Sequence, residues 1–518
     1  MLFNSFVFIF LFLPVVCVGF FVLAKASPRL AAGWLTVASL VFYGWWNPVY
    51  VPLLLASIAF NYATGMRIAL LHERGRKTDG KRLLLVAIGV NLALLGYFKY
   101  TNFFLANLLP LTGDAAPLPE IVLPLGISFF TFTQIAFLVD AHRGVAREYS
   151  FVHYALFVSY FPHLIAGPIL HHREMMPQFQ ARSTYRLNWE NLAVGLTMFV
   201  IGLFKKTVIA DGVAGFVTPA FDAAAAGTPL TLLEAWGAAL AYAFQIYFDF
   251  SGYTDMALGA SRMFGIVLPL NFRSPYKSRS IIDFWRRWHI TLSRFLRDYV
   301  YIPLGGNRHG NARMFGNLFA TMLIGGLWHG AGWTFVAWGA LHGVYLIVNR
   351  GWRALRRRAR LEVRMAEKAL ATLLTFVAVV VAWVLFRAPT FGAAITVLEG
   401  MAGRHGTVFP ERWATRGGGV GSWLAGTGAT FGHLEHFDRI AEANWIVALL
   451  LVCWFLPNTQ QILAAYRPAL TTSGYGEIDS AGRWRWKPGL GWLMLLASLG
   501  AYALLSVNGY SEFIYFQF

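Results

Sequence analysis

Long apolar stretches recur from one end of the chain to the other, separated by short polar or basic segments. A helix needs about 20 mostly apolar residues to cross roughly 30 Å of hydrocarbon. The strongest candidates are residues 7–23, 83–98, 192–204, 318–328, 369–386, 445–455 and 490–505. Because lipid cannot satisfy backbone amides, each stretch is predicted to be a helix and not an open strand. The pattern therefore predicts an all-α polytopic membrane protein, with residues 1–518 in a single domain.

Interruptions of this pattern predict less regular structure. Pro124, Pro162 and Pro168 break apolar runs, which is typical of kinked or re-entrant helices that line a cavity. Residues 281–299 have the apolar spacing of an amphipathic helix, which we expect at the cytoplasmic membrane interface. The glycine-rich segment 400–443 predicts an irregular external connection.

Composition and charge support a membrane location. Of the 518 residues, 57% are apolar and 13% are charged. The formal net charge of +18 raises nucleic acid as a partner, but the distribution of the charge argues against it. Basic residues concentrate in segments 67–82 and 350–364, which flank apolar helices as cytoplasmic loops do. We therefore expect contact with membrane lipids and no binding of nucleic acid.

Neither cysteine suggests a metal site or a disulfide. Cys17 and Cys453 lie in apolar segments, where cysteine is typically a small core residue. The sequence has no CxxC, HExxH or EF-hand spacing, so no metal is expected.

His329 is the most informative polar residue. It lies about 16 residues after Arg313, which corresponds to roughly 24 Å along a helix. An ionisable side chain at such depth is costly and therefore indicates a function, and imidazole suits proton transfer near neutral pH. Glycines around it would let a substrate approach the backbone: Gly325, Gly326, Gly330 and Gly332. A histidine that only hydrogen-bonds between helices is the alternative.

His289 is the second candidate, beside Arg286 and Arg287 on the predicted amphipathic helix. It could position or polarise a thioester, and an interfacial histidine in an aromatic belt is the alternative. The basic residues of segment 273–297 could attract an anionic cytosolic donor such as a coenzyme A phosphate, with Arg286, Arg287 and Arg294 as the candidates. A basic helix that faces lipid headgroups remains open.

Two further motifs give weaker signals. Asp249, Ser251 and Asp255 end an apolar run, but no G-x-S-x-G sequence surrounds the serine, so buried ion pairs with nearby arginines are favoured over a nucleophile triad. The GGNR sequence at 305–308 could contact a phosphate but lacks the lysine and serine of a P-loop.

Several motifs resemble the membrane-bound O-acyltransferase family, in its branch of bacterial alginate O-acetyltransferases. They are DFWRRWHITLS at 283–293 followed by YIPLGGNR at 301–308, GGLWHGAGW at 325–333, FPHLIAGP at 161–168 and DFSGYTD at 249–255. The resemblance covers most of the chain, with the family motifs at approximately 120–400.

This resemblance implies a ring of about 10–12 tilted transmembrane helices with re-entrant or interfacial helices around a central channel. It implies that His329 is catalytic and that His289 is its partner. His163 stands where relatives are expected to carry another polar residue, so it is given no role. The protein is expected in a bacterial inner membrane, where the donor arrives from the cytoplasm and the acceptor from the other side.

The expected function is O-acetyl transfer from a cytosolic thioester, acetyl-CoA, towards an exported polysaccharide, with alginate as the first choice and no bound cofactor. The resemblance also implies periplasmic or membrane-anchored acetyltransferase partners, one of which could offer a serine as the immediate acceptor. Cellulose, another exopolysaccharide and teichoic acid are alternative polymers. From a different class, the chain could be a polysaccharide or lipid transporter or a subunit of a secretion complex.

Overall fold

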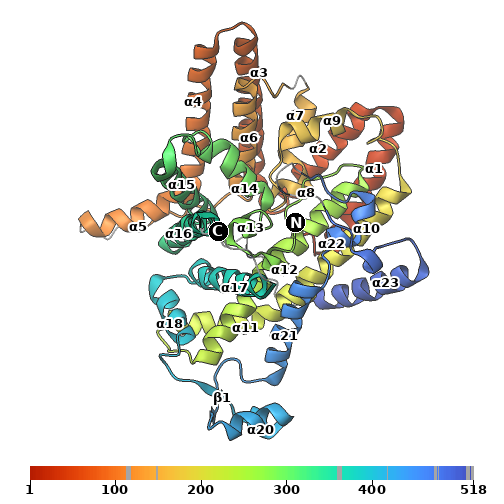
Figure 1. Ribbon diagram of the computed structural model, residues 1–518. Helices are drawn as coiled ribbons and strands as arrows, with labels where there is room; N and C mark the ends of the chain where they lie inside the picture. The colour runs from red at the N-terminus through yellow and green to blue at the C-terminus, as the bar shows by residue number, and fades with distance from the viewer. Residues whose placement is uncertain are drawn as a thin grey trace.

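The computed structural model describes residues 1–112, 118–147, 150–358, 365–416, 418–471, 475, 478–508 and 514. Within these ranges the protein is almost entirely helical, as predicted, and its one sheet pairs two short parallel strands. Five described helical stretches are long and apolar enough to cross a membrane: Phe8–Ala26, Pro48–Glu73, Lys77–Leu111, Trp189–Ala225 and Ala366–Arg387. Shorter apolar helices accompany them (Figure 1).

The N-terminal part forms two groups of helices. Helices α3, α4 and α6 pack against one another, and α2 packs on α1 and α7 (Figure 1). The bounds are α1 Leu13–Ala26, α2 Pro28–Gly44, α3 Val51–Glu73, α4 Lys77–Leu95, α5 Thr101–Thr112, α6 Ile127–His142, α7 Phe151–Ser159, α8 Phe161–Leu164 and α9 His172–Gln180. A π-helical turn, η3 (Gly96–Tyr100), joins α4 to α5.

Helix α12 (Leu232–Met263) forms the centre of the molecule and is buried along most of its length. It packs on α10 (Trp189–Phe204) and α11 (Asp211–Ala225). Helix α10 can approach closely because Gly195 faces the backbone of Gly259, and Gly202 that of Gly252. A Cβ atom at any of these positions would overlap backbone atoms of the facing helix.

Two buried ion pairs fasten α12 to the π-helical segment η4 (Lys205–Ala210). Lys205 Nζ lies 2.7 Å from Asp255, and Lys206 Nζ lies 2.7 Å from both Asp249 and Asp211. The prediction of buried ion pairs is confirmed. Their expected partners were arginines, which is wrong: the cations are lysines, placed by the wide π-helical turn beside α12.

Segment 281–299 is not one amphipathic interfacial helix, so that prediction is wrong. The segment divides into α13 (Ile281–Trp285), α14 (Ile290–Leu296) and the π-helical turn η6 (Arg297–Tyr301). His289 separates the first two with a φ of 41°, a left-handed conformation that ends a helix. Trp288, His289 and Arg294 are each at most 1% exposed, so this segment enters the core.

A long hairpin follows. Helices α15 (Gly310–His329) and α16 (Trp333–Arg358) pack closely because Gly326 and Gly339 face backbone atoms of the partner helix. Helices α17 (Met365–Arg387) and α18 (Phe391–Met401) then lead towards α11 and α12.

Segment 400–443 contains more structure than the irregular connection we expected. Strand β1 (Val408–Pro410) pairs with β2 (Thr430–Gly432), and α19 (Glu411–Arg416) and α20 (Gly418–Gly426) lie between them. This unit projects from the helical body (Figure 1). Helices α21 (Ile440–Phe455), α22 (Thr459–Ile462) and α23 (Leu490–Leu505) complete the described chain.

Candidate active site

His329 is the last residue of α15 and is almost completely buried. Three aromatic rings surround its imidazole, with centroid distances of 4.9 Å to Trp328, 5.2 Å to Trp338 and 5.1 Å to Phe386. Its Nδ1 atom is buried and has no hydrogen-bond partner among the described residues. An imidazole held by rings and free of strong polar partners can exchange a proton with a bound molecule.

His289 is fixed by Asn271, which lies in the connection between α12 and α13. Its Nδ1 lies 3.2 Å from Asn271 Oδ1. The backbone N–H of Thr291 and the Thr291 hydroxyl donate to the same oxygen, at 3.3 Å and 2.9 Å. Because Oδ1 accepts from a backbone amide, it is the oxygen and not the nitrogen of Asn271 that faces His289. His289 Nδ1 therefore carries the hydrogen.

The two histidines meet although they come from different segments. Their ring centroids are 6.3 Å apart, and Trp328 contacts both rings. His289 Nε2 is buried without a hydrogen-bond partner in the described part of the chain. The structure thus brings together the two histidines that the sequence singled out.

One cavity reaches His329. It has a volume of about 190 Å³ and is lined by Trp46, Lys99, Gly126, Ser128, Trp328 and His329, among others. Its other walls are mostly apolar side chains of segment 123–129. We refer to it as the histidine cavity.

Two adjoining cavities lie towards the other end of α15, with volumes of about 340 and 470 Å³. They share Ile282, Arg286 and Arg350 as lining residues. Further arginines line one or the other: Arg297, Arg353 and Arg357. We refer to the pair as the arginine cavities. Arg350 Nε is buried without a hydrogen-bond partner among the described residues, so part of this charge is unsatisfied.

Helix α15 connects the two kinds of cavity. Met322 lines an arginine cavity and Trp328 lines the histidine cavity, a separation of about six residues or roughly 9 Å along the helix. Stacked rings lie beside this part of α15: Phe132 lies 4.1 Å from Phe295 and 5.4 Å from Trp328 between centroids. An aromatic stack therefore lies beside the part of α15 that joins the two kinds of cavity.

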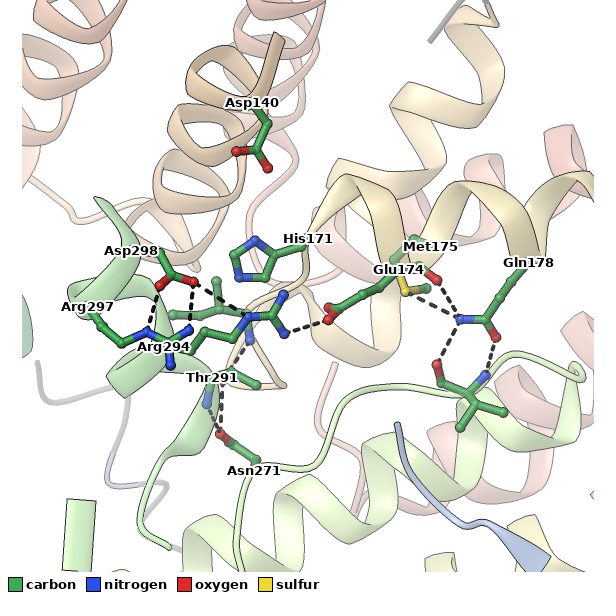
Figure 2. Close-up of polar contacts among 12 residues, drawn as sticks. Asp140, His171, Glu174, Met175, Gln178, Asn271, Thr291, Arg294, Arg297 and Asp298 are labelled. Carbon is green, nitrogen blue, oxygen red and sulfur yellow. Dashed lines mark hydrogen bonds and ion pairs between the residues drawn. The ribbon is translucent and has the colours of Figure 1, made fainter. Parts of the chain in front are cut away.

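The three arginines proposed from the sequence have different surroundings. Arg286 lines both arginine cavities. Arg287 pairs with Asp283 at 2.9 Å, and buried Arg294 lies 2.5 Å from Glu174. Figure 2 shows the guanidinium of Arg294 extending between Glu174 and Asp298. The geometry thus makes Arg286 accessible to a bound anion and gives Arg287 and Arg294 acidic partners.

Other sequence candidates lie outside the histidine pair. Asp249 and Asp255 are held by the lysine ion pairs. Ser251 lies 3.3 Å from Lys205 Nζ, so its hydroxyl faces this network. His163 is buried, and its Nε2 lies 2.9 Å from the carbonyl of Phe157. Among the described residues no group of His, Cys, Asp and Glu could hold a metal ion, and both cysteines are free.

Three residues of this region were not found from the sequence. Asn271 gave no motif signal, and Lys99 follows an apolar run that we ended at Phe98. His342 on α16 is fully buried, with Trp338 between it and His329 at centroid distances of 4.8 and 5.2 Å. A histidine inside the apolar run after His329 was a usable signal. Lys99 could have been found as a cation directly after an apolar span.

The chain is similar to a known family of membrane enzymes. The model of the membrane-bound O-acyltransferase family matches residues 94–388. A peptidoglycan O-acetyltransferase of Helicobacter pylori is 47% identical over 433 residues, which cover 78% of this chain and 80% of that protein. A Pseudomonas putida protein named "Probable alginate O-acetylase AlgI" is 37% identical over 533 residues, with 100% of both chains covered.

A more distant relative carries a different acyl group. The teichoic acid D-alanyltransferase of Bacillus subtilis is 30% identical over 233 residues, which cover 43% of this chain and 58% of that protein. The named activities of these relatives are all acyl transfers.

Proposed function

The chain belongs to the membrane-bound O-acyltransferase family and is a multi-pass membrane acyltransferase, and from this premise we propose that it acetylates an exported or cell-envelope polysaccharide. The acetyl group would come from a cytosolic thioester and reach a hydroxyl on the outer side of a bacterial inner membrane. The observation that carries this proposal is the position of His329 in the wall of the histidine cavity, on the same helix, α15, that also lines an arginine cavity.

Charge supports the assignment of sides. Arg350, Arg353 and Arg357 line an arginine cavity and belong to the basic segment that the positive-inside rule places in the cytoplasm. The basic segment between α3 and α4 should lie on the same side, so Trp46 and Lys99, at the opposite ends of these neighbouring helices, belong to the outer side. The histidine cavity would therefore open outward.

The donor that best fits the arginine cavities is acetyl-CoA. Its phosphates are polyanionic, and guanidinium groups bind phosphate through paired hydrogen bonds. Arg286 and Arg350 are suited to the contact because both cavities share them. The thioester arm would then extend along α15 towards His329, over the roughly 9 Å that separate the cavities.

The chemistry moves one proton in two transfers through His329. His329 takes the proton of the acceptor hydroxyl while the hydroxyl oxygen attacks the thioester carbonyl. A carbon–oxygen bond forms, the carbon–sulfur bond breaks, and the proton passes from His329 to the leaving thiolate. The products are an acetyl ester and the free thiol.

From the sequence, His289 could position or polarise a thioester, and the hydrogen on its Nδ1 favours a positioning role. With the hydrogen on Nδ1 and bonded to Asn271, the neutral ring presents a lone pair at Nε2. The single proton of the acceptor hydroxyl goes to His329, so this atom is free to accept a hydrogen bond from another donor group of the bound substrates and to orient them. It could polarise a carbonyl only after taking up a proton.

The relatives support two polymers. Alginate is favoured by the relative that matches over the full length of both chains, and peptidoglycan by the one with 47% identity. The immediate acceptor is either a polymer hydroxyl or the serine of a periplasmic or membrane-anchored acetyltransferase. A transporter is less well supported, because the arginines gather at the cavities towards one end of α15. Lys99, the one charged residue among the described residues that line the histidine cavity, already has acceptors in Ser128, Trp328 and His329.

The test is the acetyl ester content of both polymers in a deletion strain complemented with the wild type or with His329→Ala. Secreted polysaccharide is analysed by proton NMR, and muropeptides by mass spectrometry, at matched protein levels. The proposal expects esters on one polymer with the wild type and none with the variant. Esters on neither polymer with the wild type would refute the proposed substrate class. Loss of polymer export in the deletion strain would favour the transporter.

A further inference from the structure

Lys99 and Tyr100 contact the end of α15 that carries His329. Lys99 Nζ lies 2.5 Å from the carbonyl oxygen of Trp328 and 3.2 Å from that of His329. The Tyr100 hydroxyl donates to the carbonyl of Leu327 at 2.6 Å. Two neighbouring side chains thus bind three consecutive carbonyls.

These carbonyls have few other partners. The last carbonyls of a helix have no intrahelical donor, and a buried one without a partner destabilises the helix end. In the described part of the chain no backbone N–H outside α15 donates to residues 327–329. A cation at a helix C-terminus is also favoured by the helix dipole. Lys99 therefore satisfies both the hydrogen bonds and the charge of this helix end.

The π-helical turn η3 explains how both side chains reach the same place. It spans Gly96–Tyr100, and such wide turns are often found at functional sites because they redirect side chains. Helix α5 adds a further contact. Asn107 Oδ1 accepts a hydrogen bond from the Trp333 indole at 2.8 Å, just beyond the turn that follows His329. Segment 96–107 thus contacts the chain at the carbonyls of residues 327–329 and at the Trp333 side chain that follows.

We propose that Lys99 and Tyr100 are positioning residues for acyl transfer, which set His329 in the histidine cavity by holding the carbonyls of residues 327–329. Lys99 lines that cavity, yet its three N–H groups already have three acceptors, the third being Ser128 Oγ at 3.4 Å. It therefore acts through the backbone of α15 and not by contact with the substrate. The inference rests on the proposed function of His329.

The first test compares full-length variants in membrane vesicles with acetyl-CoA as the probe and thiol release as the readout. Lys99→Met removes all three donors, and we expect kcat to fall roughly 10- to 100-fold, since small displacements of a catalytic group have effects of this size. KM for acetyl-CoA should stay near the wild-type value. Lys99→Arg should restore most of kcat, and Tyr100→Phe, which keeps the ring, should lower it less than Lys99→Met.

Tyr97→Phe is the matched control, because Tyr97 belongs to the same turn and is exposed. An unchanged kcat in folded Lys99→Met and Tyr100→Phe would overturn the proposal. A rise in KM with unchanged kcat would also overturn it, because it would make Lys99 a substrate contact.

A second readout is independent of acyl transfer. The rate at which diethyl pyrocarbonate modifies His329 is followed by peptide mass spectrometry in each variant. We expect a changed rate in Lys99→Met and an unchanged one in Tyr97→Phe; equal rates in wild type and Lys99→Met would overturn the positioning role. If wild type consumed no acetyl-CoA, the proposed function would fail. The modification rate would still test whether Lys99 and Tyr100 position His329.

Discussion

Asn271 Oδ1 accepts hydrogen bonds from Nδ1 of His289 and from the backbone N–H of Thr291. The amide donor identifies the oxygen of Asn271, and that oxygen determines which nitrogen of His289 carries hydrogen. The lone pair of His289 then lies at Nε2, on a ring whose centroid is 6.3 Å from that of His329. The tautomer of His289 is thus set by Asn271, which is not part of the histidine pair.

Asn271→Ala should impair catalysis without unfolding the protein. The variant removes the acceptor that holds His289 and allows the other tautomer, so kcat should fall by roughly 10- to 100-fold. Steady-state kinetics with acetyl-CoA check this. Asn271→Asp keeps an acceptor for the same hydrogen and should retain more activity than Asn271→Ala. Equal activity in the alanine variant and the wild type would show that the tautomer does not matter.

His329→Ala should abolish most of the activity. Loss of a general base costs about 10² to 10⁴ in rate. The measurement is the rate of acetyl ester formation at matched protein levels. His433→Ala, at an exposed histidine after β2, is the control and should be active. Full activity of His329→Ala would make this histidine structural.

Arg286→Ala or Arg350→Ala should weaken donor binding. Loss of one charged hydrogen bond worth about 1.4 kcal/mol would raise KM for acetyl-CoA about tenfold. The wild-type KM should also rise with salt, because partly exposed charges are screened. Arg287→Ala is the neighbouring control, since Arg287 already pairs with Asp283. A KM that none of these changes affects would place the donor elsewhere.

Gly339→Ala should loosen the hairpin of α15 and α16. A Cβ atom there would overlap the carbonyl of Met322, so the helices must separate, at a cost of about 1–3 kcal/mol in stability. Thermal unfolding in detergent checks this. Gly316→Ala on α15 has open space around its Cβ and should be neutral or slightly stabilising. Similar melting temperatures for the two variants would contradict the packing argument.

Lys206→Met should be strongly destabilising. It leaves the buried carboxylate of Asp249 and the half-buried carboxylate of Asp211 without the shared cation, and breaking a buried pair from one side costs about 3–5 kcal/mol. The double variant Lys206→Met with Asp249→Asn should recover part of the loss. Thermal unfolding of the two variants distinguishes this from a simple packing defect, for which the second change would add to the loss.

The helical class could be predicted from local sequence, and the two histidines could be singled out from the motifs in which they lie. Apolar runs of sufficient length must be helical in lipid, and histidines inside characteristic motifs are visible without a structure. The end of α15 at His329 also follows from the glycines after it. These features need no knowledge of which segments meet.

The rest depends on contacts between distant segments. A break in 281–299 requires the left-handed backbone of His289, which no apolar spacing reveals. Asn271 acquires its role only when the chain before α13 folds back on α14. From the sequence alone Lys99 resembles a residue at the start of a loop. Only the structure shows that η3 directs its side chain towards α15. Arginines were expected as the cations beside α12 for the same reason. Lys205 and Lys206 contact α12 in space but lie far from its acidic residues in the sequence.

The stacked rings of Phe132, Phe295 and Trp328 have a consequence for the energy supply of the cell. A membrane holding about 100 mV loses about 2.3 kcal/mol for each elementary charge that leaks through. Stacked aromatic rings offer no chain of ionisable groups along which protons could move, while a neutral acetyl group needs none. Under the proposed function, an acetyl group would therefore cross the membrane without carrying charge, and the membrane potential would be kept.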